Sequence, residues 1–442
     1  MKKFTKILLI GCLLVTVSCN NWLDVEPKSQ VKDKDLSASE MGFKEALSGV
    51  YSLMTKEALY GKELTFGWLG VLGQEWTSVP YNYEDDQKYD FENAASEVRI
   101  DSVWTGLYNA IANANKLLKE LEGKENLFSG DNYFIIKGEV LALRAYLHFD
   151  LLRIFGASCT VGMERIAIPY VTEYAPTIFP QEKVGDFVGK VLNDLQDAAK
   201  CLENDPILTG RTVSEIDDNG YLMNRQVHLN YYAVKGLMAR VYLYKGDYAN
   251  AEVCAKEVIG SGCFEWVKQE NLTNESVADL TFSTEHLFAL NIVTLGNIVD
   301  KYLDGGNNSF ALEESRLSEY YGSSYDYRYL YLFKTGVGMS NTLRYLKKYD
   351  QLESVSWAQS YRNKLPLICL PEMYYILAEC RYHSSGDVLE PLNEVCRHRG
   401  VADLSEADLS AFETLLLAEY RKEVIGGGQL FFQYKRLNRS VV

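Results

Sequence analysis

Apolar residues recur at helical spacing along most of the chain. In segment 102–123 they are Leu107, Ile111, Ala114, Leu117, Leu118 and Leu121. Intervals of three and four residues are those of an amphipathic helix. Ser102 is expected to cap this helix, and Gly123 to end it. Alternation with a period of two, which marks a half-buried strand, is scarce, so the pattern predicts an all-α fold.

Segment 137–156 is apolar on two faces. One face consists of Leu141, Ala145, His148, Leu152 and Phe155, and the other of Leu143, Leu147, Leu151 and Ile154. A helix with two apolar faces lies inside a helical array and not on its rim. His148 is therefore expected to be a hydrogen-bonded core residue and not a metal ligand.

Two longer segments have the pattern of helical hairpins. Segment 229–262 predicts two helices joined by a Lys-Gly-Asp-Tyr turn, in which Gly246 permits the turn and Asp247 caps the second helix. Its length is close to the roughly 34 residues of a tetratricopeptide unit. Segment 370–400 repeats the plan around Ser-Gly-Asp. We expect a tetratricopeptide-like scaffold, with generic helix pairs as the alternative.

Two other segments are rich in Gly, Asn, Ser and Tyr and read as long loops. They span about residues 271–364 and 66–93. Loops of this length are usually functional or disordered, and their aromatic density argues against disorder. No clear linker divides the chain. The prediction is one helical domain over residues 37–442, carrying long ligand-binding loops.

The first residues have the order of a bacterial lipoprotein signal. Lys2, Lys3 and Lys6 precede an apolar run at 7–17, and a small residue then precedes Cys19. Residues 1–18 are predicted to be removed, Cys19 to carry the acyl chains, and residues 19–36 to form a tether. A plain cleaved signal with an incidental cysteine is the alternative. No later stretch is long and apolar enough to cross a bilayer.

Charge and cysteine content narrow the possible functions. The chain carries 60 acidic and 45 basic residues, for a net charge of −15, which disfavours nucleic-acid binding. Seven cysteines follow Cys19 without a CxxC pair, so there is no zinc or redox signature. Cys254 and Cys380 lie in helical patterns and are expected to be buried thiols. Whether Cys254 pairs with Cys263 stays open at this point.

The sequence shows no strong catalytic motif and predicts no cofactor. HExxH, GxSxG and P-loop patterns are absent, and the glycines at 426–428 indicate a turn at a helix end. Residues 215–220 imitate half of a calcium loop, but the twelfth position is Gln226 where Glu is required. We expect a solvated turn there, no metal site and no catalytic residue.

The aromatic loops are the candidate binding surface. A sugar packs its C–H face on an aromatic ring, and Asn, Asp or Arg side chains bind its hydroxyls. The candidate ligand-binding residues are Trp76, Tyr81, Asn82, Tyr83 and Asp85 in one loop and Asn307, Asn308, Tyr320, Tyr321 and Tyr325 in the other. Asp326 and Arg328 are expected to form a local salt bridge.

Seven stretches in order resemble the SusD/RagB family of outer-membrane nutrient-binding lipoproteins, over nearly the whole chain. They are CNNWLDVEP at 19–27, GEVLALRAYLHFDLLRIFG at 138–156, YYAVKGLMARVYLYKGDYANAEVCAKEVI at 231–259, STEHLFAL at 283–290, DYR with KKY at 326–328 and 347–349, LICLPEMYYILAEC at 367–380, and EYRKEVIGGGQLFFQYKR at 419–436. Two departures stand out. The family's usual Glu-Gly pair is replaced by Ile425-Gly426, and Asn20 and Asn21 follow the cysteine where acids are common.

The resemblance implies an all-helical fold and a non-catalytic role. It implies that the protein is held at the outer membrane, on the cell surface, by the lipid on Cys19. It also implies a SusC-like TonB-dependent transporter as partner and a nutrient, often an oligosaccharide, as ligand. Peptide is the competing ligand class. The rival functions are a helical glycosidase, which needs two facing carboxylates about 5–9.5 Å apart, and a lipoprotein that binds only its transporter.

Overall fold

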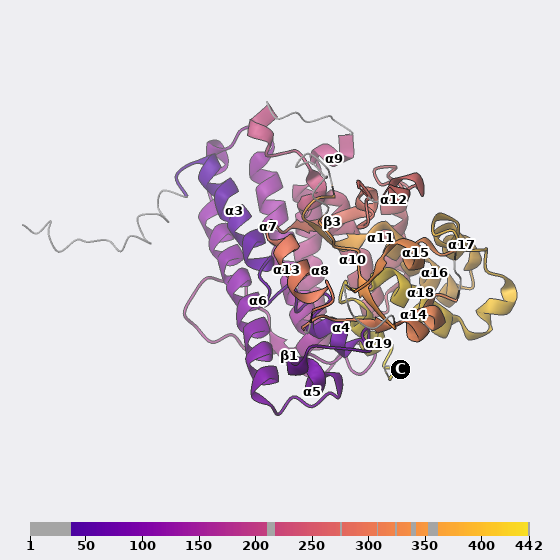
Figure 1. Cartoon of the computed structure of the whole chain (residues 1–442). Helices are drawn as coiled ribbons and strands as arrows, with labels where there is room; N and C mark the ends of the chain where they lie inside the picture. Colours follow the sequence, from indigo (N-terminus) through magenta and orange to yellow (C-terminus); the bar gives the residue numbers. More distant parts are fainter. Residues whose placement is uncertain are drawn as a thin grey trace, which may run out of the picture.

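The computed structural model describes residues 37–209, 217–274, 276–306, 308–322, 325–336, 342–351 and 361–440. The predicted signal peptide at 1–18, the anchor Cys19, the tether at 19–36 and Asn307 lie outside the described residues. Helices dominate the described part, as Figure 1 shows, and the all-α prediction is confirmed.

The α-helices are α3 (Glu40–Met54), α4 (Trp68–Leu72), α5 (Glu84–Gln87), α6 (Ala94–Leu121), α7 (Asn132–Phe155), α8 (Val184–Cys201), α9 (Pro206–Thr209), α10 (Tyr231–Lys245), α11 (Tyr248–Ile259), α12 (Glu270–Thr273), α13 (Leu295–Tyr302), α14 (Glu314–Tyr321), α15 (Tyr327–Tyr331), α16 (Leu370–Ser384), α17 (Leu389–His398), α18 (Phe412–Val424) and α19 (Leu430–Arg436). The strands are β1 (Ile166–Pro169), β2 (Gln181–Lys183), β3 (His286–Asn291), β4 (Leu312–Glu313), β5 (Phe333–Thr335), β6 (Leu343–Leu346) and β7 (Lys364–Cys369). They form three small antiparallel sheets, in the orders β1-β2, β3-β7 and β4-β6-β5.

Helix α7 lies inside the scaffold, packed between α6 and α8. Most of its residues are buried, as its two apolar faces predict. His148 is fully buried and hydrogen-bonded. Its Nδ1 lies 2.8 Å from the carbonyl oxygen of Arg144, and its Nε2 accepts the backbone N–H of Val171 at 2.9 Å. The prediction of a hydrogen-bonded core histidine is confirmed.

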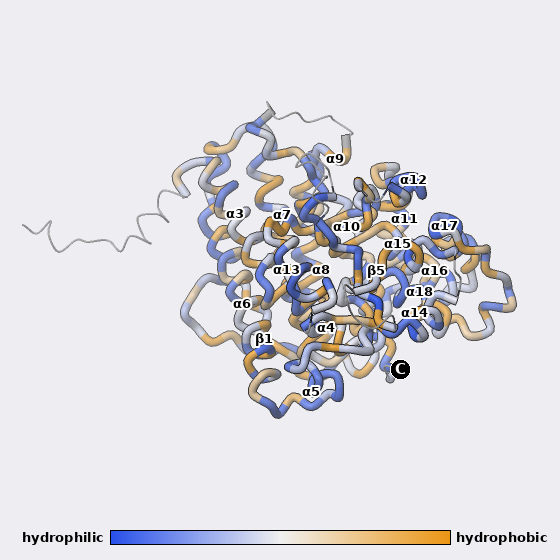
Figure 2. The backbone as a smooth tube through the Cα atoms, viewed as in Figure 1, coloured by the Kyte–Doolittle hydropathy of each residue, from blue (hydrophilic) through white to orange (hydrophobic). Residues whose placement is uncertain are grey.

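The predicted hairpins are present. Gly246 ends α10 with φ +81°, and the Asp247 carboxylate caps α11 by accepting the backbone N–H of Asn250. Helices α16 and α17 form the second pair, and α16 packs on α11. The scaffold is therefore a stack of tetratricopeptide-like hairpins. Figure 2 shows the peripheral helices α5 and α17 largely in the hydrophilic colour.

Helix α6 begins earlier than its apolar pattern predicts. Its N-cap is Asn93, whose side chain accepts the backbone N–H of Ser96. Ser102 lies inside the helix and donates its hydroxyl to the carbonyl of Val98 at 2.6 Å, so its prediction as the cap was wrong. The first two turns are mostly exposed, so they contribute few residues to the apolar period. Gly123, at φ +71°, does follow the helix end.

The C-terminal helices form a lobe with its own apolar cluster. Its members, from α16 to α19, include Tyr375, Leu392, Phe412, Leu416, Tyr420 and Leu430. Gly426, Gly427 and Gly428 form the turn between α18 and α19, as predicted. Gly428 lies so close to the N-terminal part of the chain that a Cβ there would come within 2.5 Å of the Leu64 carbonyl oxygen. No helix of the described ranges combines the length and apolarity needed to span a bilayer.

Candidate functional site

The two aromatic segments predicted as loops contain short helices and strands, and they meet in space. An isolated antiparallel bridge joins Ser78 to Ala311. The ring of Phe310 lies 5.9 Å from that of Trp76 and 5.1 Å from that of Tyr83, measured between centroids. Contacts between buried aromatic rings therefore join segments that are more than 200 residues apart in the sequence.

Three of the predicted binding residues lie in the core. Trp76, Tyr83 and Tyr321 are 2%, 1% and 4% exposed. The indole N–H of Trp76 donates to the carbonyl of Phe66 at 2.7 Å, and the hydroxyl of Tyr321 donates to the carbonyl of Lys422 at 3.0 Å. These side chains hold the segments in shape and present no ring to a ligand at the surface.

The exposed candidates do not form one surface. Tyr81, Asn82 and Asp85 are exposed where η2 (Tyr81–Tyr83) leads into α5, and Asn308 and Tyr325 are exposed in the second segment. Figure 1 places α5 and α15, which Tyr325 closely precedes, well apart. A single small ligand therefore cannot contact both the start of α5 and Tyr325.

Tyr320 is different, because it lines a surface groove of about 670 Å³. The groove lies between α14, α18 and the end of α19. Its lining residues are Arg316, Glu319, Tyr320, Glu413, Thr414, Leu417, Ala418, Arg421, Tyr434, Asn438, Arg439 and Ser440. The α18 members follow the helical period, so they come from one face of that helix.

Arg421 is held between two tyrosines in this groove. Its guanidinium carbon lies 4.3 Å from the ring centroid of Tyr320, and its Nη2 donates to the hydroxyl of Tyr434 at 2.7 Å. Burial raises the pKa of Tyr320 above its usual value, so its side chain is uncharged beside Arg421. A planar guanidinium stacked on one ring and bonded to another has a fixed orientation.

Two ion pairs lie at the rim of the groove. Arg316 pairs with Glu319 at 3.1 Å, and Arg439 pairs with Glu413. About half of each side chain is exposed, so these pairs are in contact with solvent. The groove thus combines tyrosine rings, arginine donors and carboxylate acceptors, which are the groups that bind a polyhydroxylated ligand.

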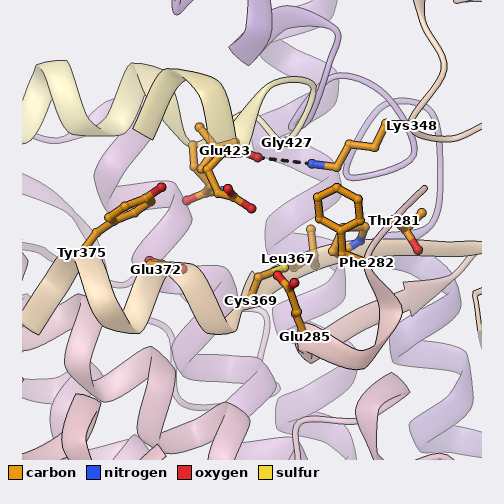
Figure 3. Close-up of a pocket in the computed structure, with 13 residues that line it drawn as sticks. Thr281, Phe282, Glu285, Lys348, Leu367, Cys369, Glu372, Tyr375, Glu423 and Gly427 are labelled. Carbon is orange, nitrogen blue, oxygen red and sulfur yellow. Dashed lines mark hydrogen bonds between the residues drawn. The ribbon is translucent and has the colours of Figure 1, made fainter. Parts of the chain in front are cut away.

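The opposite face of α18 is fixed by buried ion pairs. Glu423 accepts hydrogen bonds from Arg399 at 2.8 and 3.0 Å and from Arg328 at 2.9 Å. Arg399 also binds Glu285 at 2.5 and 2.9 Å. Figure 3 shows Glu423 and Glu285 beside a small cavity, with the ammonium of Lys348 donating to the Glu423 carbonyl at 3.4 Å. That cavity holds about 50 Å³, room for a few water molecules but not for a sugar ring.

The carboxylates of this cluster differ in pKa because their partners differ. Burial raises the pKa of Glu423, but the facing charges of Arg399 and Arg328 outweigh it and bring it to about 2. Of these cations only Arg399 faces Glu285, so the effect of burial prevails and the pKa of Glu285 lies above its usual value. Burial also lowers the pKa of Lys348. The cluster holds α18 on the face opposite the groove, and this fixes the position of Arg421 in the groove.

Several other predicted features lie within the described residues. Asp326 and Arg328 form the predicted salt bridge at 2.7 Å, fully buried. Cys254 and Cys380 are buried as predicted, and Cys254 is not bonded to Cys263. Within the described ranges there is no cluster of three or more His, Cys, Asp or Glu placed to hold a metal. Asp218 of the imitated calcium loop instead pairs with Lys44 at 2.6 Å.

Sequence reasoning missed most of the groove. The C-terminal stretch at 419–436, which only its family resemblance marked, contains Arg421 and Tyr434, and Arg439 follows it. Arg316 precedes the predicted Tyr320 by four residues. The available signal was the mixture of charged and aromatic residues in that stretch, at 419–436. Tyr89 was not predicted either, but its hydroxyl donates to the carbonyl of Leu72 at 2.8 Å, and it does not line the groove.

Comparison with known families identifies the class of protein. A SusD-like family model, described as "Starch-binding associating with outer membrane", matches residues 21–243, about half of the chain. The chain belongs to this SusD-like family.

Curated relatives and solved structures agree with this assignment. SusD-like protein P38 of Formosa agariphila is 24% identical over 269 residues, covering 60% of this chain and 47% of that protein. SusD-like protein P25 of the same organism is 24% identical and covers 35% of this chain and 31% of its own length. The chain therefore matches about half or less of the length of these curated relatives.

The structural likeness covers more of the chain. A SusD superfamily protein of Bacteroides thetaiotaomicron superimposes with a TM-score of 0.73 at 22% identity, covering 91% of this chain and 90% of that one. A putative sugar binding protein of Bacteroides vulgatus gives 0.72 at 22% identity, with 91% and 88% covered. A laminarin binding SusD-like protein gives 0.67 at 17% identity, with 91% and 92% covered. At these identities the likeness shows the fold.

Proposed function

We propose that this protein captures a glycan in the groove between α14, α18 and α19, without catalysis. The observation that carries the proposal is the fixed arrangement of Tyr320, Arg421 and Tyr434 along a groove of about 670 Å³. Residues 37–442 act as one binding unit in this proposal. Membership of a family described as starch-binding, and the fold shared with a laminarin binding protein, support a glycan over a peptide.

The groove matches the chemistry of a sugar. Sugars carry C–H faces that pack on apolar and aromatic surface, here supplied by Tyr320, Leu417 and Ala418. Their hydroxyls both donate and accept hydrogen bonds, so they can bind Asn438 and the carboxylate–arginine pairs of the rim. Among the residues predicted from sequence, Tyr320 is the proposed ligand contact.

Capture serves uptake at the outer membrane in this proposal. Cys19 carries the lipid anchor, residues 19–36 form the tether, and the body presents the glycan to a SusC-like TonB-dependent transporter at the cell surface. The family description, which associates its members with the outer membrane, supports this location. Two acyl chains on one cysteine would suffice for stable anchoring.

Hydrolysis is the rival outcome. A glycosidase needs one carboxylic acid that gives up a proton and a second carboxylate facing it. The two carboxylates of the groove, Glu319 and Glu413, each pair with an arginine instead. That arrangement favours holding a ligand over cleaving it.

The test is retardation of purified residues 20–442 in native gels that contain a panel of polysaccharides. We expect retardation by at least one glycan and its loss, by tenfold or more in affinity, in Tyr320→Ala. Tyr325→Ala, an exposed tyrosine outside the groove, is the matched control and should migrate as the wild type does. Retardation by no glycan, or equal effects of the two variants, contradicts the proposal. Shortening of the glycan during incubation supports the hydrolase instead.

A further inference from the structure

The charge of the groove differs from that of the whole chain. Three arginines and two glutamates line it, in a protein whose net charge is −15. We propose that the ligand of this groove is an acidic glycan, whose sugar units carry carboxylate or sulfate groups. This inference rests on the proposed function and names the substrate class of the same site.

The orientation of Arg421 favours an anionic ligand. Its guanidinium lies against the ring of Tyr320 and donates to the hydroxyl of Tyr434, and the residue is 8% exposed. A guanidinium is only a hydrogen-bond donor, so a ligand that binds it must supply acceptors. Carboxylate and sulfate oxygens accept the strongest such bonds, often two from one guanidinium.

The two other arginines reach the same groove from different elements. Arg316 comes from α14, and Arg439 follows α19. Each forms an ion pair in which both side chains are substantially exposed. Exposed pairs of this kind contribute little, so a ligand oxyanion can replace the glutamate at small cost. Three guanidiniums around one groove suit a polymer that repeats its negative charge.

The carboxylates do not oppose this reading. Glu319 and Glu413 each lie against an arginine, so their charge is locally compensated. The net charge of −15 on the chain would repel acidic polymers that do not fit the groove. Selectivity would then depend on contact with the arginines, and it should weaken as salt screens that contact.

The experiment is calorimetric titration of residues 20–442 with three size-matched oligosaccharides at 50 mM NaCl. One is a uronic-acid oligomer, one a sulfated galactan oligomer and one a neutral β-glucan oligomer. We expect at least one acidic oligomer to bind tenfold or more tightly than the neutral one, with the advantage reduced at 300 mM NaCl. The affinities of the first two oligosaccharides show whether the groove prefers carboxylate or sulfate groups.

Variants locate the effect. Arg421→Gln should lose tenfold or more in affinity for the acidic oligomer. Because Arg421 is nearly buried, Arg316→Gln provides a second variant at the exposed rim and should lose about threefold or more without a change in unfolding. Arg397→Gln is the matched control, since it removes an exposed, ion-paired arginine outside the groove.

Each outcome has a distinct meaning. Tighter binding of the neutral oligomer, or equal binding of acidic and neutral ones, overturns the inference and leaves glycan capture standing. Equal losses in Arg397→Gln and Arg316→Gln also overturn it. Binding of none of the oligomers, together with no retardation by any polysaccharide, removes the proposed function itself.

Discussion

The helical scaffold and the C-terminal lobe differ in how their buried charges are arranged. In the scaffold, α7 and α10 are buried on nearly all sides, mostly by apolar side chains. In the lobe, α18 is held by a buried set of arginines and carboxylates around Arg328, Arg399 and Glu423. The scaffold also contains buried pairs, which are Arg153 with Asp150, Arg225 with Glu139 and Arg240 with Glu372, so both regions combine apolar burial with charge pairing. The lobe differs because two arginines and four carboxylates form a single network against one face of α18.

The difference corresponds to the position of the groove. Bidentate ion pairs fix the rotation of a helix and the direction of its side chains, and in the lobe they do so on the face of α18 opposite the groove. Helix α18 carries Glu419 and Glu423 inward and Arg421 outward into the groove. We infer that the buried network orients a binding face as well as stabilising the lobe.

The largest expected effect is in the lobe. Arg399→Met leaves the carboxylates of Glu285 and Glu423 without this partner in a buried site, which should cost about 3–5 kcal/mol of unfolding free energy. Urea unfolding followed by fluorescence at pH 7 measures it. Arg397→Met removes an exposed pair two residues away and should cost less than about 1 kcal/mol. Similar losses in the two variants would contradict the role given to the network.

The scaffold should respond to a lost apolar side chain. Leu147→Ala in α7 removes a fully buried side chain and should cost about 2–5 kcal/mol. Leu147→Met keeps the volume and should cost less than about 1.5 kcal/mol. The losses of unfolding free energy in Arg399→Met and Leu147→Ala should also depend differently on pH. The loss in Arg399→Met should shrink below about pH 4, where carboxylates take up protons, and the loss in Leu147→Ala should not.

His148 in the scaffold and Glu423 in the lobe should lose their contributions to stability in different pH windows. Burial lowers the pKa of His148 to about 3, so the unfolded chain binds its proton first, and stability falls as the pH drops below about 6.5. The Glu423 pKa of about 2 lies below its usual 4.5, so its contribution is lost only as the pH drops below about 4.5. His148→Gln should remove about 1–3 kcal/mol of the change between pH 6.5 and 4, measured by unfolding at each pH. An unchanged slope would show that His148 does not bind its proton there on unfolding.

A smaller effect is expected where the two regions meet. Glu75 is fully buried and accepts the backbone N–H of Gly426 at 2.8 Å, and burial raises its pKa to about 7. Its contribution is complete below about pH 4.5 and is lost as the pH rises through 7. Glu75→Gln keeps an acceptor for Gly426 and should gain about 1–2 kcal/mol at pH 8, with little change at pH 5. A loss at both pH values would mean that the ionised carboxylate stabilises this junction.

Much of the scaffold could be predicted because its signals are local. The turn at Gly246 and Asp247 is specified by neighbouring residues, and the apolar residues on two faces of α7 predict that it is buried on nearly all sides. The start of α6 was missed because its first turns are exposed and add nothing to its apolar period. Local patterns therefore predict the presence of a helix better than the residues at which it begins and ends.

The site was harder to predict, because aromatic density does not show which way a ring points. Trp76 and Tyr83 pack on Phe310, a contact between segments far apart in the sequence. Arg421, Lys422 and Glu423 follow one another, yet Arg421 lines the groove and Glu423 binds the buried arginines. The two residues differ in role because the packing of α18 turns one face of the helix to the groove and the opposite face to the buried arginines. Tyr320 was predicted from sequence, but its partner Arg421 was not.

Glycan capture in the groove is tested most directly by hydrogen exchange of residues 20–442 with and without the glycan that retards the protein most. If the glycan binds in the groove, backbone amides at 314–321, 413–421 and 430–439, in the elements that line it, should exchange more slowly. No change is expected at 81–87 or 325–331. Protection confined to either of those outlying segments, with exchange in α14, α18 and α19 unaltered, would contradict the account.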